Sequence, residues 1–512
     1  MTTEAFIVHS NGPSATVQLL SGDSPVPSLL LDAGGDPRLR YQAANRLGHI
    51  PYSRLQPELF KRTAAPLIPG LYEPLQPAHP KTISDLMTIL QTTVSDPAER
   101  DLIKQGVTWQ AQLPVAVKGV YSSHPHFDSN LALPPIRPEI PLYASPETIA
   151  VLKALGVIMP HVDRRFLSVR RPDENGKLTY VDRQVHEIKP QVEEHISGLG
   201  NLTLSATDHF LGSTAADITT DMGARLTFTS DLGAGAKTNE ALEAILRAAP
   251  ETAVLFLDVN NLADEGHPRT VNELESELLT TIRALKKQNL YVQIPRRDLG
   301  RLKLISEVAK HTGRKVVVPW QLAAFQQMVA ESVPEVALNY NDIYLTPRSS
   351  ASYQPKDYPA RIRDLIFNSG LNVHTPWELA KLAGKAPIIS IIEDESQFRH
   401  INPRQFLPKD KTKAQTLIYA GHQLPKSEQQ LLARISSNAE MGFTNLETTM
   451  HLPPEILMDF LSQLMVGLLV PLHTIRPSAA NEKIKQSGFK GTVLHNIVRG
   501  LPYGYNGKRL LK

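Results

Sequence analysis

Short apolar runs separated by polar turns dominate the first half of the chain, and this pattern predicts β-strands. Residues 15–20 and 27–32 give the first two strands, on either side of a polar turn at 21–27. Further strands are expected within 115–123, 140–144, 201–221 and 224–233. Apolar residues at helical spacing predict helices at 84–105 and 145–156. The first half should therefore be rich in β-structure.

Beyond about residue 237 the pattern changes to an alternation of helices and apolar strands. Helices are expected at 237–250, 270–288 and 300–312, with strands at 252–259, 290–295 and 315–320. Such alternation predicts parallel βαβ units, and hence a second, doubly wound α/β domain. Strand and loop character returns at 467–477. We therefore expect a first domain over residues 1–240, an inserted α/β domain over 241–440, and a return to the first domain over 441–512.

Length and composition narrow the class of protein. A chain of 512 residues exceeds what one hydrophobic core usually covers, which agrees with two domains. It has no run of about 18 consecutive apolar residues, and its start, MTTEAFIVHSNG, lacks a basic and an apolar leader region. We therefore expect a soluble, cytoplasmic protein without a membrane partner. Because the chain contains no cysteine, any metal must be held by His, Asp and Glu.

Charge indicates partners only locally. The net charge of +3 is nearly neutral, so a nucleic-acid-binding surface would have to be a local one. Residues 483–512 contain seven Lys and Arg and no acidic residue, although a solvated basic tail explains this equally well. Tyr503 and Tyr505 in this stretch suit base stacking or, as we favour, a Gly/Tyr turn. A second basic group, near the start of the helix at 300–312, comprises Arg296, Arg297, Arg301 and Lys303.

The strongest chemical signal is the sequence His124-Pro-His126-Phe-Asp128 at the end of a predicted buried strand. On an extended loop, two imidazoles two residues apart can face one metal, and a carboxylate two residues further can reach a second. Other apolar runs also end in such residues: Asp32, His209, Asp231 and His473. Surface histidines and a solvated carboxylate could explain one motif alone, but not this agreement between strand ends. The sequence therefore predicts a metal site.

The order of these motifs resembles that of a known family. The set LLLDAGG, SHPHFDSN, ATDHFLGS, FTSDLG and VPLHT looks like the five metal motifs of the metallo-β-lactamase superfamily. The insertion between Asp231 and His473 is similar to the β-CASP domain of ribonuclease J, Artemis and cleavage-factor nucleases. Asp258 in VLFLDVNN and His451 in ETTMHLPPE resemble motifs A and B of that group, and His473 would be motif C. The resemblance implies an α/β fold, a metallo-β-lactamase αββα sandwich with an inserted α/β β-CASP domain.

The resemblance also implies a set of metal ligands. It places His124, His126 and His209 at one metal, Asp128 and His473 at a second, and Asp231 as a bridge between them. Neutral imidazoles and carboxylates suit one or two Zn²⁺ ions, with Mn²⁺ or Mg²⁺ as alternatives. A pair of cations about 3.5–4 Å apart can activate water and stabilise the charge that develops on a phosphodiester.

Four residues are candidates for catalytic roles by the same resemblance. Asp128 would act through its metal, and Asp32 would orient a ligand or the loop that carries it. Asp258 and His451 would position a substrate phosphate or assist proton transfer. From the sequence alone, a helix-capping role for Asp258 and a helix-start role for His451 stay open.

One position departs from the family pattern. The usual motif is His-x-His-x-Asp-His, and its last position here is Ser129, whose hydroxyl is a weak metal ligand. The second site would then keep Asp128, Asp231 and His473, with lower affinity or a changed metal preference. A mononuclear enzyme, a Mg²⁺- or Mn²⁺-dependent one, or a weakened one are all compatible with this change.

The function implied by the resemblance is that of a metal-dependent hydrolase. Within the group, it would be a ribonuclease J-like phosphodiesterase that cleaves RNA or single-stranded DNA with metal-activated water. Two alternatives stay open. One is a hydrolase of another ester or a small nucleotide, since a fold does not determine its substrate. The other is a metal-poor nucleic-acid-binding or regulatory protein in which Ser129 marks lost catalysis. The sequence leaves exo- or endonuclease action open, and it is compatible with a homo-oligomer.

Overall fold

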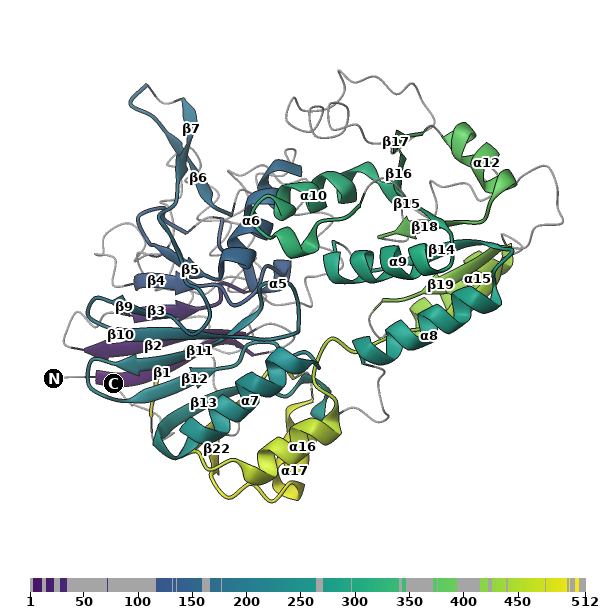
Figure 1. Cartoon of the computed structure of the whole chain (residues 1–512). Coiled ribbons are helices and arrows are strands. Elements are labelled where there is room, and N and C mark those ends of the chain that lie inside the picture. The colour runs from purple at the N-terminus through teal and green to yellow at the C-terminus, as the bar shows by residue number, and fades with distance from the viewer. Residues whose placement is uncertain are drawn as a thin grey trace, which may run out of the picture. The chain divides into compact units, whose positions relative to one another are not determined.

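The computed structural model describes most of the chain as two compact units (Figure 1). Described are residues 3–11, 15–22, 28–34, 71, 117–130, 132–134, 136–158, 166–175, 177–263, 270–295, 297–339, 343–346, 372–374, 376–393, 415–421, 426–438, 441–474, 476–494, 497 and 502–505. The helix expected at 84–105 and the basic residues beyond 494 lie outside these ranges, as does the side chain of Asp128. Unit 1 comprises residues 1–265 and 451–512, and unit 2 comprises residues 266–450.

Unit 1 contains two seven-stranded sheets. The first has the order β23 (Pro502–Gly504), β1 (Thr3–Asn11), β2 (Ala15–Gly22), β3 (Ser28–Leu31), β4 (Val117–Tyr121), β5 (Leu142–Ala144) and β8 (Val185–Glu187). The second has the order β22 (Thr492–Val493), β21 (Leu468–Leu472), β13 (Thr252–Asp258), β12 (Arg225–Phe228), β11 (Thr214–Thr220), β10 (Gly200–Ala206) and β9 (Glu193–Ile196). In each sheet antiparallel strands give way to parallel ones, at β3 in the first and at β12 in the second.

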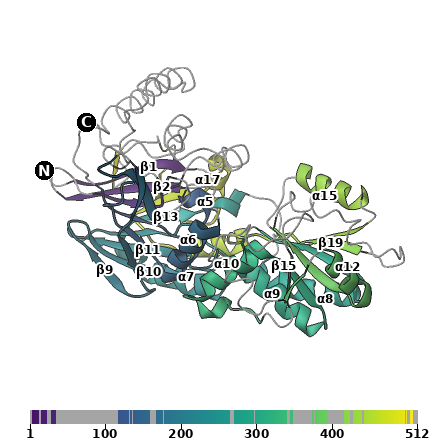
Figure 2. The same ribbon diagram turned by 90° about the horizontal axis from the view of Figure 1, so that it is seen from above.

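The two sheets of unit 1 pack face to face around one apolar core. Buried side chains of both sheets meet there, and the ring of Phe6 in β1 contacts that of Phe256 in β13 edge-to-face at 5.0 Å between centroids. Figure 2 shows the same arrangement from above, with β1 and β2 over β13. Tyr503 is buried in this core and stacks on Phe6, and it belongs to strand β23 rather than to the Gly/Tyr turn expected there.

Helices cover the outer face of the second sheet. These are α7 (Ala236–Ala248), α16 (Pro454–Gln463) and α17 (Pro477–Gln486), whose apolar residues form a second buried cluster with β13 and β21 (Figure 1). Two further helices of unit 1 are α5 (Phe127–Asn130) and α6 (Pro146–Ile158). The loop before α6 supplies Ser145, whose hydroxyl caps the helix through the N–H of Thr148. The α/β class expected from the sequence is thereby confirmed.

The inserted unit begins later than the pattern change indicated. Helix α7 and strand β13 were expected to open the second domain at residue 241, but both belong to unit 1, and unit 2 begins at Gly266. The reason is strand pairing, because β13 lies between β12 and β21 and pairs with both in parallel. Unit 2 ends at Met450 rather than at 440, since β20 (Gly442–Asn445) pairs with β19 (Gln415–Tyr419) inside its sheet.

Unit 2 is built around one parallel seven-stranded sheet, as the alternating pattern predicts. Its order is β17 (Asn372–Val373), β16 (Ile343–Thr346), β15 (Lys315–Pro319), β18 (Ile388–Ile392), β14 (Asn289–Gln293), β19 and β20. Its longer described helices are α8 (Val271–Ala284), α9 (Leu299–His311), α10 (Trp320–Ala330), α12 (Pro376–Lys385) and α15 (Lys426–Asn438).

One member of the basic group in unit 2 does not face solvent. Arg301 is buried, and its guanidinium donates to Asp298, the capping residue of α9, and to the hydroxyl of Thr448. It therefore stabilises unit 2 from within and is not part of a basic surface.

Three smaller features complete the description. The two-stranded hairpin of β6 (Ser168–Pro172) and β7 (Leu178–Asp182) lies in a segment for which no strands were expected. Short 3₁₀ turns are η2 (Ala249–Glu251), η3 (Asn260–Ala263) and η4 (Pro334–Val336). No helix in the described part of the chain is long and apolar enough to cross a membrane.

Candidate metal centre

The candidate residues of unit 1 lie where strands end. Asp32 follows β3, Ser230 and Asp231 follow β12, and His473 follows β21. Three of these have left-handed backbones, with φ of 56° at Asp32, 51° at Ser230 and 58° at His473. Such a backbone is unfavourable for a residue with a side chain and persists only where its surroundings impose it. The turn geometry is thus set by the neighbouring structure and aims these side chains into one place.

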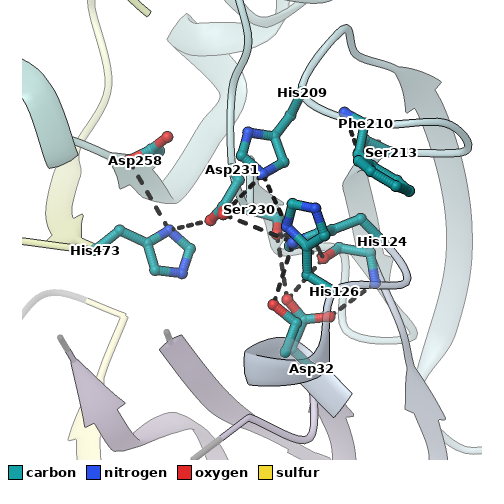
Figure 3. A network of polar contacts seen from close by, with 12 residues as sticks. Asp32, His124, His126, His209, Phe210, Ser213, Ser230, Asp231, Asp258 and His473 are labelled. Atoms are coloured by element: carbon teal, nitrogen blue, oxygen red, sulfur yellow. Dashed lines mark hydrogen bonds and ion pairs between the residues drawn. The ribbon is translucent and has the colours of Figure 1, made fainter. Parts of the chain in front are cut away.

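A first group of metal-ligand atoms consists of His124, His126, His209 and Asp231, whose atoms all lie within 4.8 Å of one another. Asp231 Oδ2 is 3.2 Å from Nε2 of His209 and 3.6 Å from Nε2 of His124. Nδ1 of His126 lies 3.2 Å from Nε2 of His209. Figure 3 shows the three imidazoles turned toward this carboxylate. The structure thus brings together residues that span more than a hundred positions.

A second group shares Asp231 and adds Asp258 and His473, again within 4.8 Å. Nδ1 of His473 is 2.8 Å from Oδ1 of Asp231 and 3.9 Å from Oδ1 of Asp258 (Figure 3). All three residues are buried. Neither ring nitrogen of His473 makes a hydrogen bond to the residues that the structure describes, and neither does Oδ1 of Asp231. Their short approach therefore lacks the alignment of an N–H···O bond.

The electrostatics of the two groups follow from burial and from their close neighbours. Burial alone would raise the pKa of Asp231, but the charges of His473, His209 and His124 hold it well below the usual range. Burial alone would lower the pKa of His473, but Asp231 and Asp258 raise it to about 9. In the absence of a cation, a proton on His473 thus compensates the buried carboxylates.

Asp258 and His451 form a close pair beside these groups. Oδ2 of Asp258 lies 2.7 Å from Nδ1 of His451 and also accepts the backbone N–H of Leu232 at 2.9 Å. Burial would lower the pKa of His451, but the charge of Asp258 raises it. The ring of His451 is 4.9 Å from that of His209 between centroids, so the Asp258–His451 pair lies next to the first group.

Asp32 lies outside both groups and contacts the loop that carries His124. It accepts the N–H and the hydroxyl of Ser123, both at 2.7 Å, and the hydroxyl of Ser230 at 3.2 Å. The Ser123 oxygen lies 2.9 Å from Nδ1 of His124. Burial raises the pKa of Asp32 to about 6, although His124 and the hydrogen bonds from Ser123 oppose the rise. Asp32 therefore fixes the loop and, through Ser123, the orientation of the His124 ring.

Three functional neighbours were not expected from the sequence. Ser123 and Ser230 carry no signal beyond their place next to His124 and Asp231. Asn130 belongs to the motif SHPHFDSN, and its amide donates to the carbonyls of His124 at 2.7 Å and His126 at 2.9 Å. An amide that bonds two carbonyls of the same loop holds both imidazoles at a fixed spacing.

Ser129, the departure from the family motif, is buried in α5. Its hydroxyl is 3.4 Å from Nε2 of His124. The side chain of Asp128 lies outside the described residues, so its expected role stays a prediction.

The donor atoms fit a divalent cation by their chemistry. Imidazole nitrogens and carboxylate oxygens are the ligands that Zn²⁺ and Mn²⁺ take in proteins, and a shared carboxylate commonly joins two such ions. The buried, unpaired nitrogens of His473 are the observation of this structure that supports the fit, because buried polar atoms normally have a partner. The described residues thus contain a plausible metal-binding site.

Comparisons with known proteins establish the fold further. A protein of unknown function from Enterococcus faecalis V583, known from a crystal structure, matches 99% of this chain and 100% of its own with a TM-score of 0.59 and 14% identity. A structure named Rm3 metallo-beta-lactamase matches 48% of this chain and 75% of its own, with a TM-score of 0.20 and 14% identity. The first shows a shared fold across both units. No protein-family profile matches the chain, and no curated protein sequence matches it significantly.

Proposed function

We propose that this protein is a metal-dependent hydrolase of the metallo-β-lactamase type, with unit 2 as its β-CASP domain, and that its substrate is RNA or single-stranded DNA. The observation that carries the proposal is the sharing of Asp231 between two groups of buried ligand atoms. A carboxylate with one oxygen toward His209 and the other toward His473 suits a pair of cations. The order of the sequence motifs, which resembles that of the β-CASP nucleases, supports a phosphodiester substrate.

The chain's own residues could divide the work of hydrolysis. His124, His126, His209 and Asp231 would hold one cation, and His473 would help to hold a second. Bound cations of this kind supply activated water and neutralise charge that develops on a phosphodiester. His451, whose pKa is raised by Asp258 despite burial, is suited to give a proton to the leaving oxygen. Asp258 keeps that imidazole oriented and charged.

A nuclease assay on the metal-free and reconstituted protein tests this function. The chain is stripped with a chelator, and Zn²⁺, Mn²⁺ or Mg²⁺ is added before incubation with end-labelled single-stranded RNA or DNA. We expect cleavage that depends on added metal and that falls at least about 100-fold in His209→Ala.

The matched control is His195→Ala, since His195 bonds to Asn201 in an exposed part of unit 1. It should retain wild-type cleavage. Metal binding without cleavage of either polymer would reject the nuclease substrate, and hydrolysis of a small ester or nucleotide by the same preparation would replace it. An absence of metal binding would reject the hydrolase itself.

A further inference from the structure

We propose that Asp258 is itself a metal ligand, so that the second cation is held by Asp231, Asp258 and His473 and the missing imidazole at position 129 is replaced from another strand. This inference rests on the proposed metal centre and makes its second position specific. It differs from the ligand set implied by the family motifs, in which Asp258 acts on substrate or protons.

The position of His473 is the first argument. Its ring is fully buried, yet neither nitrogen has a hydrogen-bond partner among the described residues. Nδ1 nevertheless lies 2.8 Å from one oxygen of Asp231 and 3.9 Å from one oxygen of Asp258. Nδ1 of His473 and one oxygen of each carboxylate thus lie close enough together to share one cation.

The hydrogen bonds of Asp258 are the second argument. Oδ2 is occupied by the N–H of Leu232 at 2.9 Å and by His451 at 2.7 Å. Among the described residues Oδ1 accepts only the N–H of Asn260, at 2.9 Å, and it is the oxygen that faces His473. One oxygen is therefore anchored while the other keeps a lone pair directed at the second group. Ligand carboxylates are commonly oriented in this way by their outer partners.

Charge is the third argument. Asp231 and Asp258 are both buried, and the charge of Asp231 opposes ionisation of Asp258. Two buried carboxylates so close together need positive charge beside them. A divalent cation supplies it, and two carboxylate oxygens with one nitrogen suit Mn²⁺ or Zn²⁺.

Ser129 lies beside the first group. Its hydroxyl is 3.4 Å from Nε2 of His124, which belongs to that group. The carboxylate of Asp258 thus supplies a donor that the hydroxyl of Ser129 cannot.

Counting bound metal in purified variants tests this assignment without any measurement of activity. Metal-free full-length protein is titrated with Mn²⁺ by calorimetry, and bound ions per chain are counted after gel filtration. We expect two ions in the wild type and one in Asp258→Asn, which keeps an oxygen for the N–H of Asn260. The second Kd should rise more than about 100-fold, beyond the tenfold to hundredfold loss usual for an outer partner.

Two further variants separate a ligand role from a structural one. Ser129→Ala should keep both ions, and so should His451→Ala, which removes the partner of Asp258 but leaves its Oδ1 in place. His473→Gln should lose the same ion as Asp258→Asn, and it provides the test if the latter fails to fold.

The outcomes are distinct. Two ions bound with wild-type affinity in Asp258→Asn, or a single ion in the wild type, would overturn the ligand role while leaving the proposed hydrolase standing. No bound ion in the wild type would overturn both. Loss of the second ion in His451→Ala as well would show that Asp258 acts through that imidazole rather than as a ligand.

Discussion

Substitution of Ser123, whose hydroxyl contacts both Asp32 and His124, tests how the loop that carries His124 and His126 is held in place. In Ser123→Ala the hydroxyl that lies 2.7 Å from Asp32, 2.9 Å from Nδ1 of His124 and 2.5 Å from Ser230 is lost. Nε2 of His124 faces Asp231, so Nδ1 carries the hydrogen when Nε2 binds a metal. The Ser123 oxygen then accepts a hydrogen bond from Nδ1, and its hydroxyl donates one to Asp32. The substitution therefore removes the hydrogen bonds of this hydroxyl with Asp32, His124 and Ser230.

The size of the effect of Ser123→Ala on stability and metal affinity follows from the hydrogen bonds that remain. Asp32 keeps the N–H of Ser123 and the hydroxyl of Ser230, whereas Nδ1 of His124 keeps only a 3.4 Å contact to Ser230. Leaving a buried polar atom unpaired costs about 1–3 kcal/mol, so the metal-free protein should lose about that much free energy of unfolding. Removal of an outer partner should weaken metal binding by about 10–100-fold.

Urea unfolding of the metal-free protein and competition with a chromophoric chelator measure these two effects. Ser205→Ala is the matched control, because Ser205 only accepts an exposed bond from Gln191, and it should change neither value. Unchanged stability and unchanged metal affinity in Ser123→Ala would refute the reasoning, and would show that backbone geometry alone orients His124.

Three other outcomes are expected. Gly212→Ala should cost more than about 1 kcal/mol and disturb the loop after His209, because φ is +82° there and a Cβ would lie 2.5 Å from the backbone nitrogen of Thr148; urea midpoints check the cost, and an unchanged midpoint contradicts it. Ser129→His should destabilise the metal-free protein by about 1–3 kcal/mol through overpacking, since Ser129 is buried beside His124. Thermal unfolding measures this change, and an unchanged or higher midpoint in the variant would contradict the expectation. Asp231 raises the pKa of His473 from 6.5 to about 9 despite burial. The stability that protonated His473 gives the metal-free chain is therefore complete below pH 6.5 and is lost as pH rises through 9, by at most about 3 kcal/mol. A urea midpoint that stays constant from pH 6 to 10 would contradict this expectation.

Much of the fold could be predicted from the sequence, because the spacing of apolar residues along the chain matches the side chains that its strands and helices bury. Apolar runs such as the one that forms β13 predicted strands, and the alternation after it predicted the parallel sheet of unit 2. The boundary between the units could not be read in this way. A strand buried on both faces has the same pattern in either sheet, and one of the two partners of β13 is β21, which lies more than two hundred residues further along the chain. The β6–β7 hairpin escaped because its strands are short and charged.

The candidate site divides in a similar way. Imidazoles and carboxylates at strand ends could be named from the sequence, since these residue types are uncommon in buried places without a role. Their grouping could not. Asp258 lies near His473 because β13 and β21 pair in parallel with Asp258 opposite Leu472, the residue before His473. No spacing along the chain encodes that pairing. Ser123 and Ser230 are common residue types whose importance arises only from contacts.

The insertion of unit 2 has a consequence for the order in which the protein is made. A ribosome completes residues 266–450 before it adds β21, β22 and β23, so unit 2 can fold while β13 still has one edge unpaired. At about 5–20 residues per second, roughly 10–40 s separate the synthesis of Asp258 from that of His473. For most of that interval Asp231 and Asp258 lack both His451 and His473. Assembly of the second group of residues is therefore one of the last events in the biogenesis of this chain, and the proposed metal binding there would follow docking of the C-terminal strands.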